Sequence, residues 1–167
     1  QVPSQREILG AVEKIKKAKR PVLIVGGGAR YAEAGEVIKT LSLQSQIPIV
    51  ETHAGKSTVE ADFQNNLGGT GILGTSAANQ ILRKADLIIG LGTRYSDFVT
   101  SSKTAYDFEK TNFLTININR MQTYKFDGFQ VVGDVKETLM AIGPHLQAYQ
   151  TKLGEEIELA KQEWRLE

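Results

Sequence analysis

The short, unbroken apolar run Val22-Leu23-Ile24-Val25, which ends in Gly26-Gly27-Gly28, constrains the fold more than any other feature. A strand without polar alternation is buried on both faces, and such strands are typical of parallel sheets covered by helices on both sides. Similar runs follow at 47–50, 86–92, 113–118 and 130–132. Helical patterns separate most of these runs, which predicts repeated strand–helix units.

The helical patterns complete this prediction. Ser4, with Glu7 three residues later, predicts a capping box at the start of the first helix, whose apolar residues recur at helical spacing. Further helices are expected over 32–44, from Thr75 or Ser76 to about 84, over 135–149 and over 155–166. The sequence therefore predicts an α/β fold, a Rossmann-like doubly wound parallel sheet of five or six strands flanked by helices.

The length sets the domain organisation. A chain of 167 residues is enough for one well-formed core and hardly for two. We expect a single domain over 1–167, with its core at about 4–150. Residues 151–167 are expected to form a C-terminal helix or linker towards a domain that this chain lacks. The opening Gln1-Val2-Pro3 also resembles a linker that enters a helix, as in a domain cut from a longer protein.

Charge and cysteine content bear on partners and compartment. A formal net charge of +1 gives no reason to expect nucleic acid or an anionic membrane as a partner. The longest apolar runs are strand-sized, far below a membrane span. The chain has no cysteine, which rules out a disulfide framework and suits a reducing cytoplasm.

Ligands of doubly wound sheets bind beyond the carboxyl ends of the strands. Glycines there let a backbone approach a diphosphate, and polar side chains can then hold the rest of a nucleotide. We therefore predict a nucleotide-shaped groove at this edge, lined by Gly27, Gly28, Thr93, Arg94, Asn117 and Asp134. The alternative is that the glycines serve only tight turns between strands and helices.

Three glycine motifs bear on this choice. The dinucleotide fingerprint G-x-G-x-x-G is broken after the first strand, since Tyr31 occupies the third glycine position. The stretch 69–74 has the full spacing, but 65–67 is not expected to be a strand. Gly55-Lys56-Ser57 resembles the end of a P-loop, yet Val50 stands where that motif needs a glycine, which excludes it.

Catalytic constellations are sparse. His53 and His145 are the only histidines, and both are expected to be polar loop or surface residues. Neither an H-E-x-x-H nor a G-x-S-x-G motif occurs. We therefore predict no catalytic residue and no metal ligand in this chain.

The order of elements from Arg20 to Val135 resembles the central domain of thiamine-diphosphate-dependent enzymes. The stretches 51–57, 66–79 and 92–98 narrow the resemblance to the hydrolases that open a cyclic 1,2-dione in inositol breakdown. The resemblance implies that the parent protein uses thiamine diphosphate and Mg²⁺, bound by flanking thiamine-binding domains. It also implies that this domain alone is catalytically inert, and that the parent associates as a homo-oligomer.

The same resemblance bears on a bound nucleotide. Some central domains of the family hold FAD or ADP, and in the acetohydroxyacid synthase branch an Asp-Ile-Asp on the fourth strand accompanies FAD. Here Asn117-Ile118-Asn119 replaces that acidic pair, which disfavours FAD. Two further alternatives remain open. One is a self-sufficient NAD-binding dehydrogenase domain with Glu51 on the ribose, and the other is an interaction module that binds no small molecule.

Overall fold

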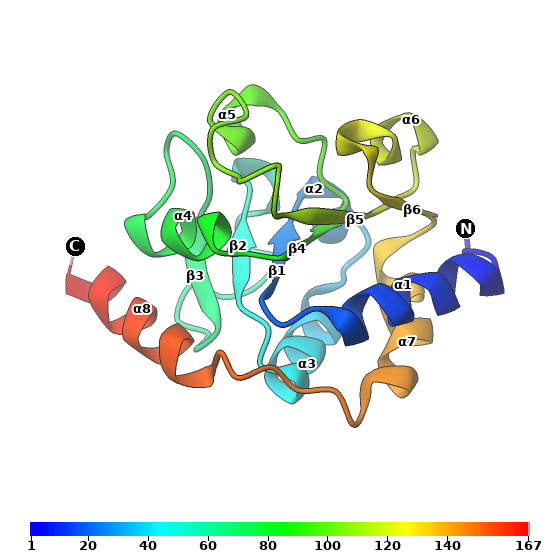
Figure 1. Ribbon diagram of the computed structural model, residues 1–167, viewed down its shortest axis with the longest axis horizontal. Coiled ribbons are helices and arrows are strands. Elements are labelled where there is room, and N and C mark those ends of the chain that lie inside the picture. The colour runs from blue at the N-terminus through cyan, green and yellow to red at the C-terminus, as the bar shows by residue number, and fades with distance from the viewer. Residues whose placement is uncertain (167) are drawn as a thin grey trace.

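The computed structural model describes residues 1–166. Six strands form one sheet in the order β3-β2-β1-β4-β5-β6, and every neighbouring pair runs parallel (Figure 1). The strands are β1 (Pro21–Val25), β2 (Ile49–Glu51), β3 (Asn66–Gly69), β4 (Leu87–Leu91), β5 (Asn112–Asn117) and β6 (Phe129–Val132). The predicted α/β doubly wound sheet is confirmed, with six strands.

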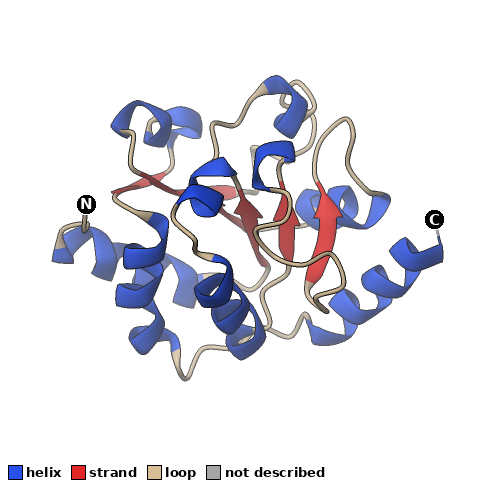
Figure 2. Ribbon diagram, turned by 180° about the vertical axis from the view of Figure 1, so that it is seen from behind, coloured by secondary structure: helices blue, strands red, loops and turns tan. Residues whose placement is uncertain are grey.

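Helices cover both faces of this sheet (Figure 2). They are α1 (Gln5–Lys17), α2 (Gly27–Tyr31), α3 (Gly35–Ser45), α4 (Ser76–Arg83), α5 (Asp97–Thr100), α6 (Arg120–Thr123), α7 (Val135–Ile142) and α8 (Gly154–Leu166). Three short 3₁₀ turns lie at His53–Gly55, Lys125–Asp127 and Gly143–Leu146. None of the helices in the described part of the chain is long and apolar enough to cross a membrane.

The position of β1 inside the sheet explains why its sequence is apolar throughout. Leu23 and Val25 pack in one core cluster with α1, α3 and α7, while Val22 and Ile24 pack in a second cluster with α4 and α8. All five residues of the strand are buried. Next to β4 and β5, aromatic rings pack together in the second cluster, among them Tyr95, Tyr106, Phe126 and Phe113 of β5 itself.

The capping box predicted at Ser4 and Glu7 is present. The Ser4 hydroxyl accepts a hydrogen bond from the Glu7 amide at 3.2 Å, and the Glu7 carboxylate accepts one from the Ser4 amide at 2.9 Å. The second Glu7 oxygen accepts a hydrogen bond from the amide of Val132 on edge strand β6 at 2.9 Å. One side chain thus begins a helix and also ties that helix to the sheet.

Three expected boundaries were wrong. The helix expected over 32–44 forms as α3 but begins only at Gly35, because Glu33 adopts φ 51° just before it, and the short α2 was not expected. The helix expected over 135–149 ends at Ile142, and Gly143-Pro144 begins a 3₁₀ turn instead. The segment 65–67 was not expected to be a strand, yet Asn66–Gly69 forms β3, because its backbone pairs with β2 despite a composition that disfavours strands.

The last helix belongs to the packed structure. Helix α8 lies against α4 and β3, with Ile157 and Lys161 buried. Figure 1 shows α8 alongside α4 on the side of the sheet that ends in β3. Whether 151–167 also leads towards a further domain stays a prediction.

Candidate functional site

The loops after β1 and β4 meet where the strand order reverses, at the point where the sequence predicts a ligand. The amide of Gly26 donates to the Leu91 carbonyl at 2.8 Å, the amide of Gly28 to the Gly92 carbonyl at 3.0 Å, and the amide of Ala29 to the Gly26 carbonyl at 3.1 Å. A Cβ on Gly28 would lie only 2.8 Å from the Gly92 Cα. The glycines therefore let two loop backbones touch, and three amides that could bind a phosphate are already engaged.

Two of the predicted polar residues, Thr93 and Asn117, brace the same loops. Thr93 is 2% exposed and Asn117 is 6% exposed. The Asn117 side-chain amide donates to the Thr93 carbonyl at 3.1 Å, and its oxygen accepts from the Asn119 amide at 2.9 Å. The Thr93 hydroxyl accepts from the Tyr95 amide at 3.2 Å. Both side chains are thus engaged within the chain.

Arg94 and Asp134 complete the predicted set. Arg94 is exposed above the loop, and its backbone carbonyl accepts a hydrogen bond from Lys125 Nζ. The Asp134 carboxylate caps α7 by accepting from the Glu137 amide at 3.0 Å. The amide of Gly133, next to it in the chain, donates to the Asn117 carbonyl at 3.1 Å. The structure therefore gathers the predicted residues at one edge of the sheet, and their role in binding stays a prediction.

The stretch 69–74 has the spacing of a dinucleotide fingerprint and, against expectation, directly follows a strand and precedes a helix. Three of its amides are nevertheless engaged: that of Gly71 bonds the Asn79 side chain at 3.0 Å, that of Ile72 the Phe98 carbonyl at 3.1 Å, and that of Gly74 the Gly71 carbonyl at 3.0 Å. Gly71 has φ +92°, and a Cβ there would lie 1.9 Å from the Phe98 carbonyl oxygen. The loop is held by internal bonds, and these three amides are not free to bind a phosphate.

Tyr31, which occupies the third glycine position of the first motif, does not disturb the packing of helix against strand. Its ring is 91% exposed, because α2 ends at this residue and the chain turns away. The histidines agree with expectation, since His53 and His145 are both exposed and lie in 3₁₀ turns.

The loop that contains Gly55-Lys56-Ser57 packs against the end of β1. The Gly55 amide donates to the Thr52 hydroxyl at 3.1 Å, and a Cβ on Gly55 would lie 2.0 Å from the Val25 carbonyl oxygen. Lys56 and Ser57 are exposed. The glycine is therefore required for packing against β1 and not for wrapping a phosphate.

Glu51, at the carboxyl end of β2, is a buried carboxylate that only the NAD alternative places on a ribose. It is 5% exposed, and within residues 1–166 its Oε2 has no hydrogen-bond partner. Burial raises the pKa of its carboxyl, against the lowering effects of the Asn66 side chain, Lys56 and the Ser57 backbone. Glu51 stands at the carboxyl edge as the NAD alternative requires, but its burial does not leave the carboxylate accessible to a ribose, which does not fit that alternative.

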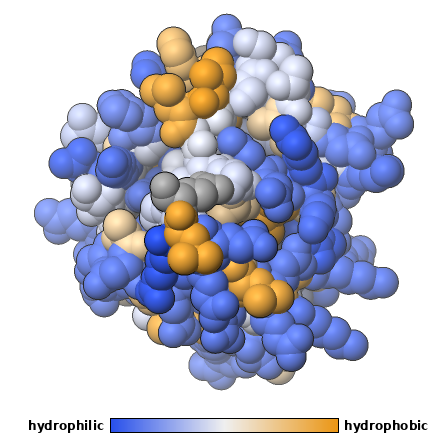
Figure 3. Space-filling model, turned by 90° about the vertical axis from the view of Figure 1, so that its left-hand side faces the viewer, coloured by the Kyte–Doolittle hydropathy of each residue, from blue (hydrophilic) through white to orange (hydrophobic). Residues whose placement is uncertain are grey.

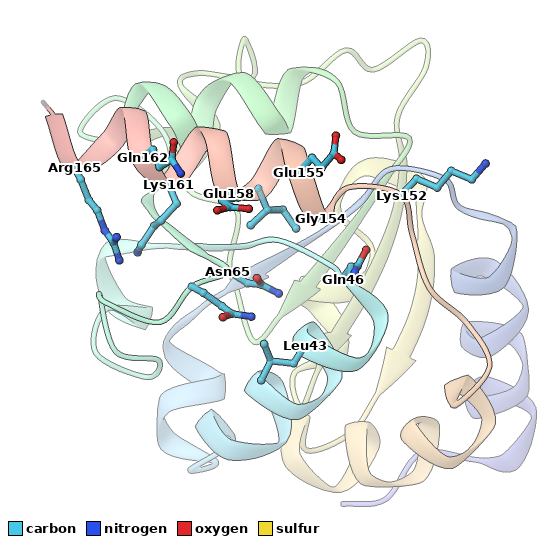
Figure 4. Close-up of a pocket in the computed structure, with 12 residues that line it drawn as sticks. Leu43, Gln46, Asn65, Lys152, Gly154, Glu155, Glu158, Lys161, Gln162 and Arg165 are labelled. Atoms are coloured by element: carbon cyan, nitrogen blue, oxygen red, sulfur yellow. The ribbon is translucent and has the colours of Figure 1, made fainter.

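A groove of about 860 Å³ that the sequence did not predict lies between α8 and the segments around α3 and β3 (Figure 4). At its base, Lys161 Nζ donates to the carbonyls of Asn66 at 2.6 Å and Ala61 at 2.5 Å, and lies 4.4 Å from the centre of the Trp164 ring. Burial lowers the pKa of the Lys161 ammonium, and the positive charge of nearby Arg165 lowers it further. The ammonium therefore joins α8 to β3. The sequence carries a signal for this contact, because the spacing of Ile157, Lys161 and Trp164 places them on one helical face.

The described residues do not provide the donors that thiamine diphosphate and its metal require. Among residues 1–166, no group of three or more histidine, cysteine, aspartate or glutamate side chains could hold a metal ion. The only Gly-Asp pair, Gly133-Asp134, uses its carboxylate to cap α7. The donor set of these residues therefore does not fit that cofactor.

Comparison with known proteins identifies similar sequences. A family model described as thiamine pyrophosphate enzyme, central domain, matches residues 8–142. A protein of Listeria monocytogenes serovar 1/2a is 60% identical over 167 residues, which are 100% of this chain and 26% of the relative. A Bacillus subtilis strain 168 protein is 58% identical over 165 residues, 99% of this chain and 26% of the relative.

Both relatives are named 3D-(3,5/4)-trihydroxycyclohexane-1,2-dione hydrolase. A protein of the same name from Halalkalibacterium halodurans is 55% identical over 163 residues, 98% of this chain and 26% of the relative. The chain thus spans about a quarter of the length of the curated relatives it matches.

Proposed function

Because the chain belongs to the family of thiamine pyrophosphate enzyme central domains, we propose that it serves as the scaffold domain of a 3D-(3,5/4)-trihydroxycyclohexane-1,2-dione hydrolase. Identity of 60% over the whole chain with a relative of that name carries the proposal. The reaction proposed for the parent is hydrolysis of a C–C bond, which opens the cyclic dione to 5-deoxy-glucuronate.

Thiamine diphosphate and Mg²⁺ belong to flanking domains of the parent in this proposal, because the residues of this chain do not fit them. When bound there, the thiamine supplies the carbanion-stabilising chemistry that breaking a C–C bond requires. This domain alone is expected to be inactive. The proposed parent acts in the cytoplasm as a homo-oligomer.

The engaged loop amides support a scaffold that binds no FAD, ADP or NAD. A diphosphate is held mainly by free backbone amides at a helix N-terminus. Here the amides of Gly26, Gly28 and Ala29 bond to carbonyls of the chain itself, and Asn117 holds the neighbouring loop closed.

Two experiments test the proposal. The purified full-length parent, supplied with thiamine diphosphate and Mg²⁺, is expected to open the cyclic dione, whereas residues 1–167 alone are expected to give no product. Calorimetric titration of residues 1–167 with ADP, FAD and NAD is expected to give no binding heat. Micromolar binding of any of these nucleotides would contradict the scaffold role, and turnover by the domain alone would contradict its inactivity.

A further inference from the structure

The groove between α8 and the segments around α3 and β3 lies at the amino edge of the sheet, opposite the loops where the sequence predicts a ligand. Gln46 comes shortly before β2 and Asn65 directly before β3, and both line the groove (Figure 4). Its volume of about 860 Å³ is in the range of sites that hold small molecules. Figure 3 views the side of the molecule on which α8 lies and shows mostly hydrophilic residues there. The groove therefore suits a polar ligand.

Asn65 presents a fixed hydrogen-bond acceptor at the groove. The residue is 7% exposed, and its Nδ2 donates to the Ser42 carbonyl at 3.1 Å and to the Ser42 hydroxyl at 3.0 Å. The hydroxyl donates in turn to the Ile47 carbonyl at 2.6 Å. Because both bonds of the Asn65 side chain within residues 1–166 use its nitrogen, Oδ1 remains as an acceptor. A polar group held in place in this way loses little conformational entropy when it binds a ligand.

The opposite wall of the groove is α8, which adds a charged acceptor. Glu158 is exposed and lines the groove, and Figure 4 shows it on the side of α8 towards Asn65. Leu43, which is 43% exposed, and the buried Ile157 add apolar surface to the same lining. The groove thus combines strong acceptors with a small apolar area.

The charges along the groove nearly cancel. The carboxylates of Glu155 and Glu158 stand against the cations of Lys152 and Arg165. The remaining charged group, Lys161, already donates to two backbone carbonyls. A nucleic acid requires an excess of cations, which this lining lacks. The balance of charge favours an uncharged ligand.

The edge strand β3, beside the groove, does not offer its backbone to a peptide. The Asn66 carbonyl accepts a hydrogen bond from Lys161 at 2.6 Å, and the Leu67 carbonyl accepts one from the Thr75 hydroxyl at 2.7 Å. The Gly68 amide donates to the Asn66 side chain at 2.9 Å. A peptide that binds by adding a strand needs such groups free. A small molecule therefore fits the groove better than an extended peptide.

We propose that this groove binds a small, uncharged, polyhydroxylated molecule, whose hydroxyl groups donate to Asn65 Oδ1 and to the Glu158 carboxylate. A hydroxyl group is both donor and acceptor, so it also matches the side-chain amides of Gln46 and Gln64, which carry both kinds of group. The apolar C–H groups of such a molecule cover Leu43. The proposal does not rest on the proposed function, because the site is separate from the carboxyl edge and needs no cofactor.

Saturation-transfer NMR of the full-length protein that contains this chain tests the proposal, with glucose and sorbitol as cyclic and open-chain probes. We expect at least one of them to bind with a dissociation constant on the order of millimolar. Cyclohexanol, which has a single hydroxyl group, is expected to bind at least about tenfold more weakly. The absence of saturation transfer to both polyols would overturn the proposal, and so would cyclohexanol that binds as tightly as the better polyol.

Two substitutions on α8 test whether the binding takes place in the groove. Glu158→Ala removes the charged acceptor and is expected to weaken binding of the polyol at least about tenfold. The control Glu163→Ala changes an exposed glutamate that lies outside the groove on the same helix, and it is expected to leave the affinity within about twofold. Polyol binding that Glu158→Ala leaves unchanged would contradict the proposal, because the ligand would then lie elsewhere on the protein.

Discussion

At the scale of single residues, glycines and polar residues that were predicted to bind a ligand also pack within the protein. Gly28 and Asn117 are positioned as predicted at the carboxyl edge, but one touches the backbone of Gly92 and the other bonds the Thr93 carbonyl. A sequence shows that a glycine follows a strand. It does not show which backbone lies against that glycine, because that partner comes from a distant part of the chain.

The buried carboxyl of Glu51 makes stability depend on pH. Its pKa is raised in the folded state, so folding favours the protonated form. The free energy of unfolding therefore falls as the pH rises from the pKa of the unfolded chain to the higher pKa of the folded one. Glu51→Gln keeps the shape without the charge. We expect it to increase the free energy of unfolding at pH 7 by roughly 1–3 kcal/mol, the cost of an unpaired buried group.

Urea unfolding at pH 7 and at pH 4 measures the effect. The gain is expected to shrink at the lower pH, where the wild-type carboxyl takes up its proton. Glu163→Gln, at an exposed position on α8, serves as the control and should change stability little at either pH. A Glu51→Gln protein less stable than wild type at pH 7 would contradict this account.

Two glycines form a contrasting pair. Gly71 has φ +92° and would place a Cβ 1.9 Å from the Phe98 carbonyl oxygen, whereas nothing lies within 4 Å of a Cβ on Gly143. Gly71→Ala is expected to lower the free energy of unfolding by at least about 1–3 kcal/mol. Gly143→Ala lies in helical backbone and should be neutral or stabilising by about 0.4–1 kcal/mol. Thermal unfolding of both variants distinguishes the two effects, and equal losses would refute the explanation.

At the scale of elements, short sequence patterns correctly predicted the helix caps and strands that interactions between neighbouring residues determine. The capping box of α1, the cap of α4 at Thr75 and the apolar strands β1, β4 and β5 lie where the sequence placed them, within a residue or two. Strand β3 was missed because Asn66, Gly68 and Gly69 have poor strand propensity, and pairing with β2 overrides that propensity. The Gly143-Pro144 pair, by contrast, was a readable stop signal for α7.

Lys161 contributes to the attachment of α8, beside the packing of Ile157 and the ion pair of Glu156 with Arg20. Lys161→Met would leave the Ala61 and Asn66 carbonyls without their charged donor, so we expect the free energy of unfolding to fall by roughly 1–3 kcal/mol. Lys152→Met, at an exposed position before the same helix, is the control. Hydrogen exchange adds a local measurement, since the amides of α8 and β3 should lose protection first. Unchanged protection there would show that Lys161 does not hold the helix.

At the scale of the whole molecule, the fold class was predictable and the details of the site were not. Alternation of apolar runs with helices requires a parallel sheet with covered faces, whichever residues fill the loops. The groove beside α8 and the burial of Glu51 depend on how loops and helices settle against one another. Those contacts join segments such as Lys161 and Ala61 that are distant in the sequence.

The strand order also sets a sequence of events during synthesis. The central strand β1 pairs with β2 on one side but waits for β4 on the other, so its second edge stays open until residues 87–91 have left the ribosome. An open apolar edge invites pairing with other chains. We expect a fragment that stops at Arg83 to aggregate in a sedimentation assay, whereas 1–167 stays dispersed; a dispersed fragment would refute this. A nascent chain therefore has a vulnerable interval, in which the open edge passes from β1 to β4 and is covered only when β5 and β6 emerge.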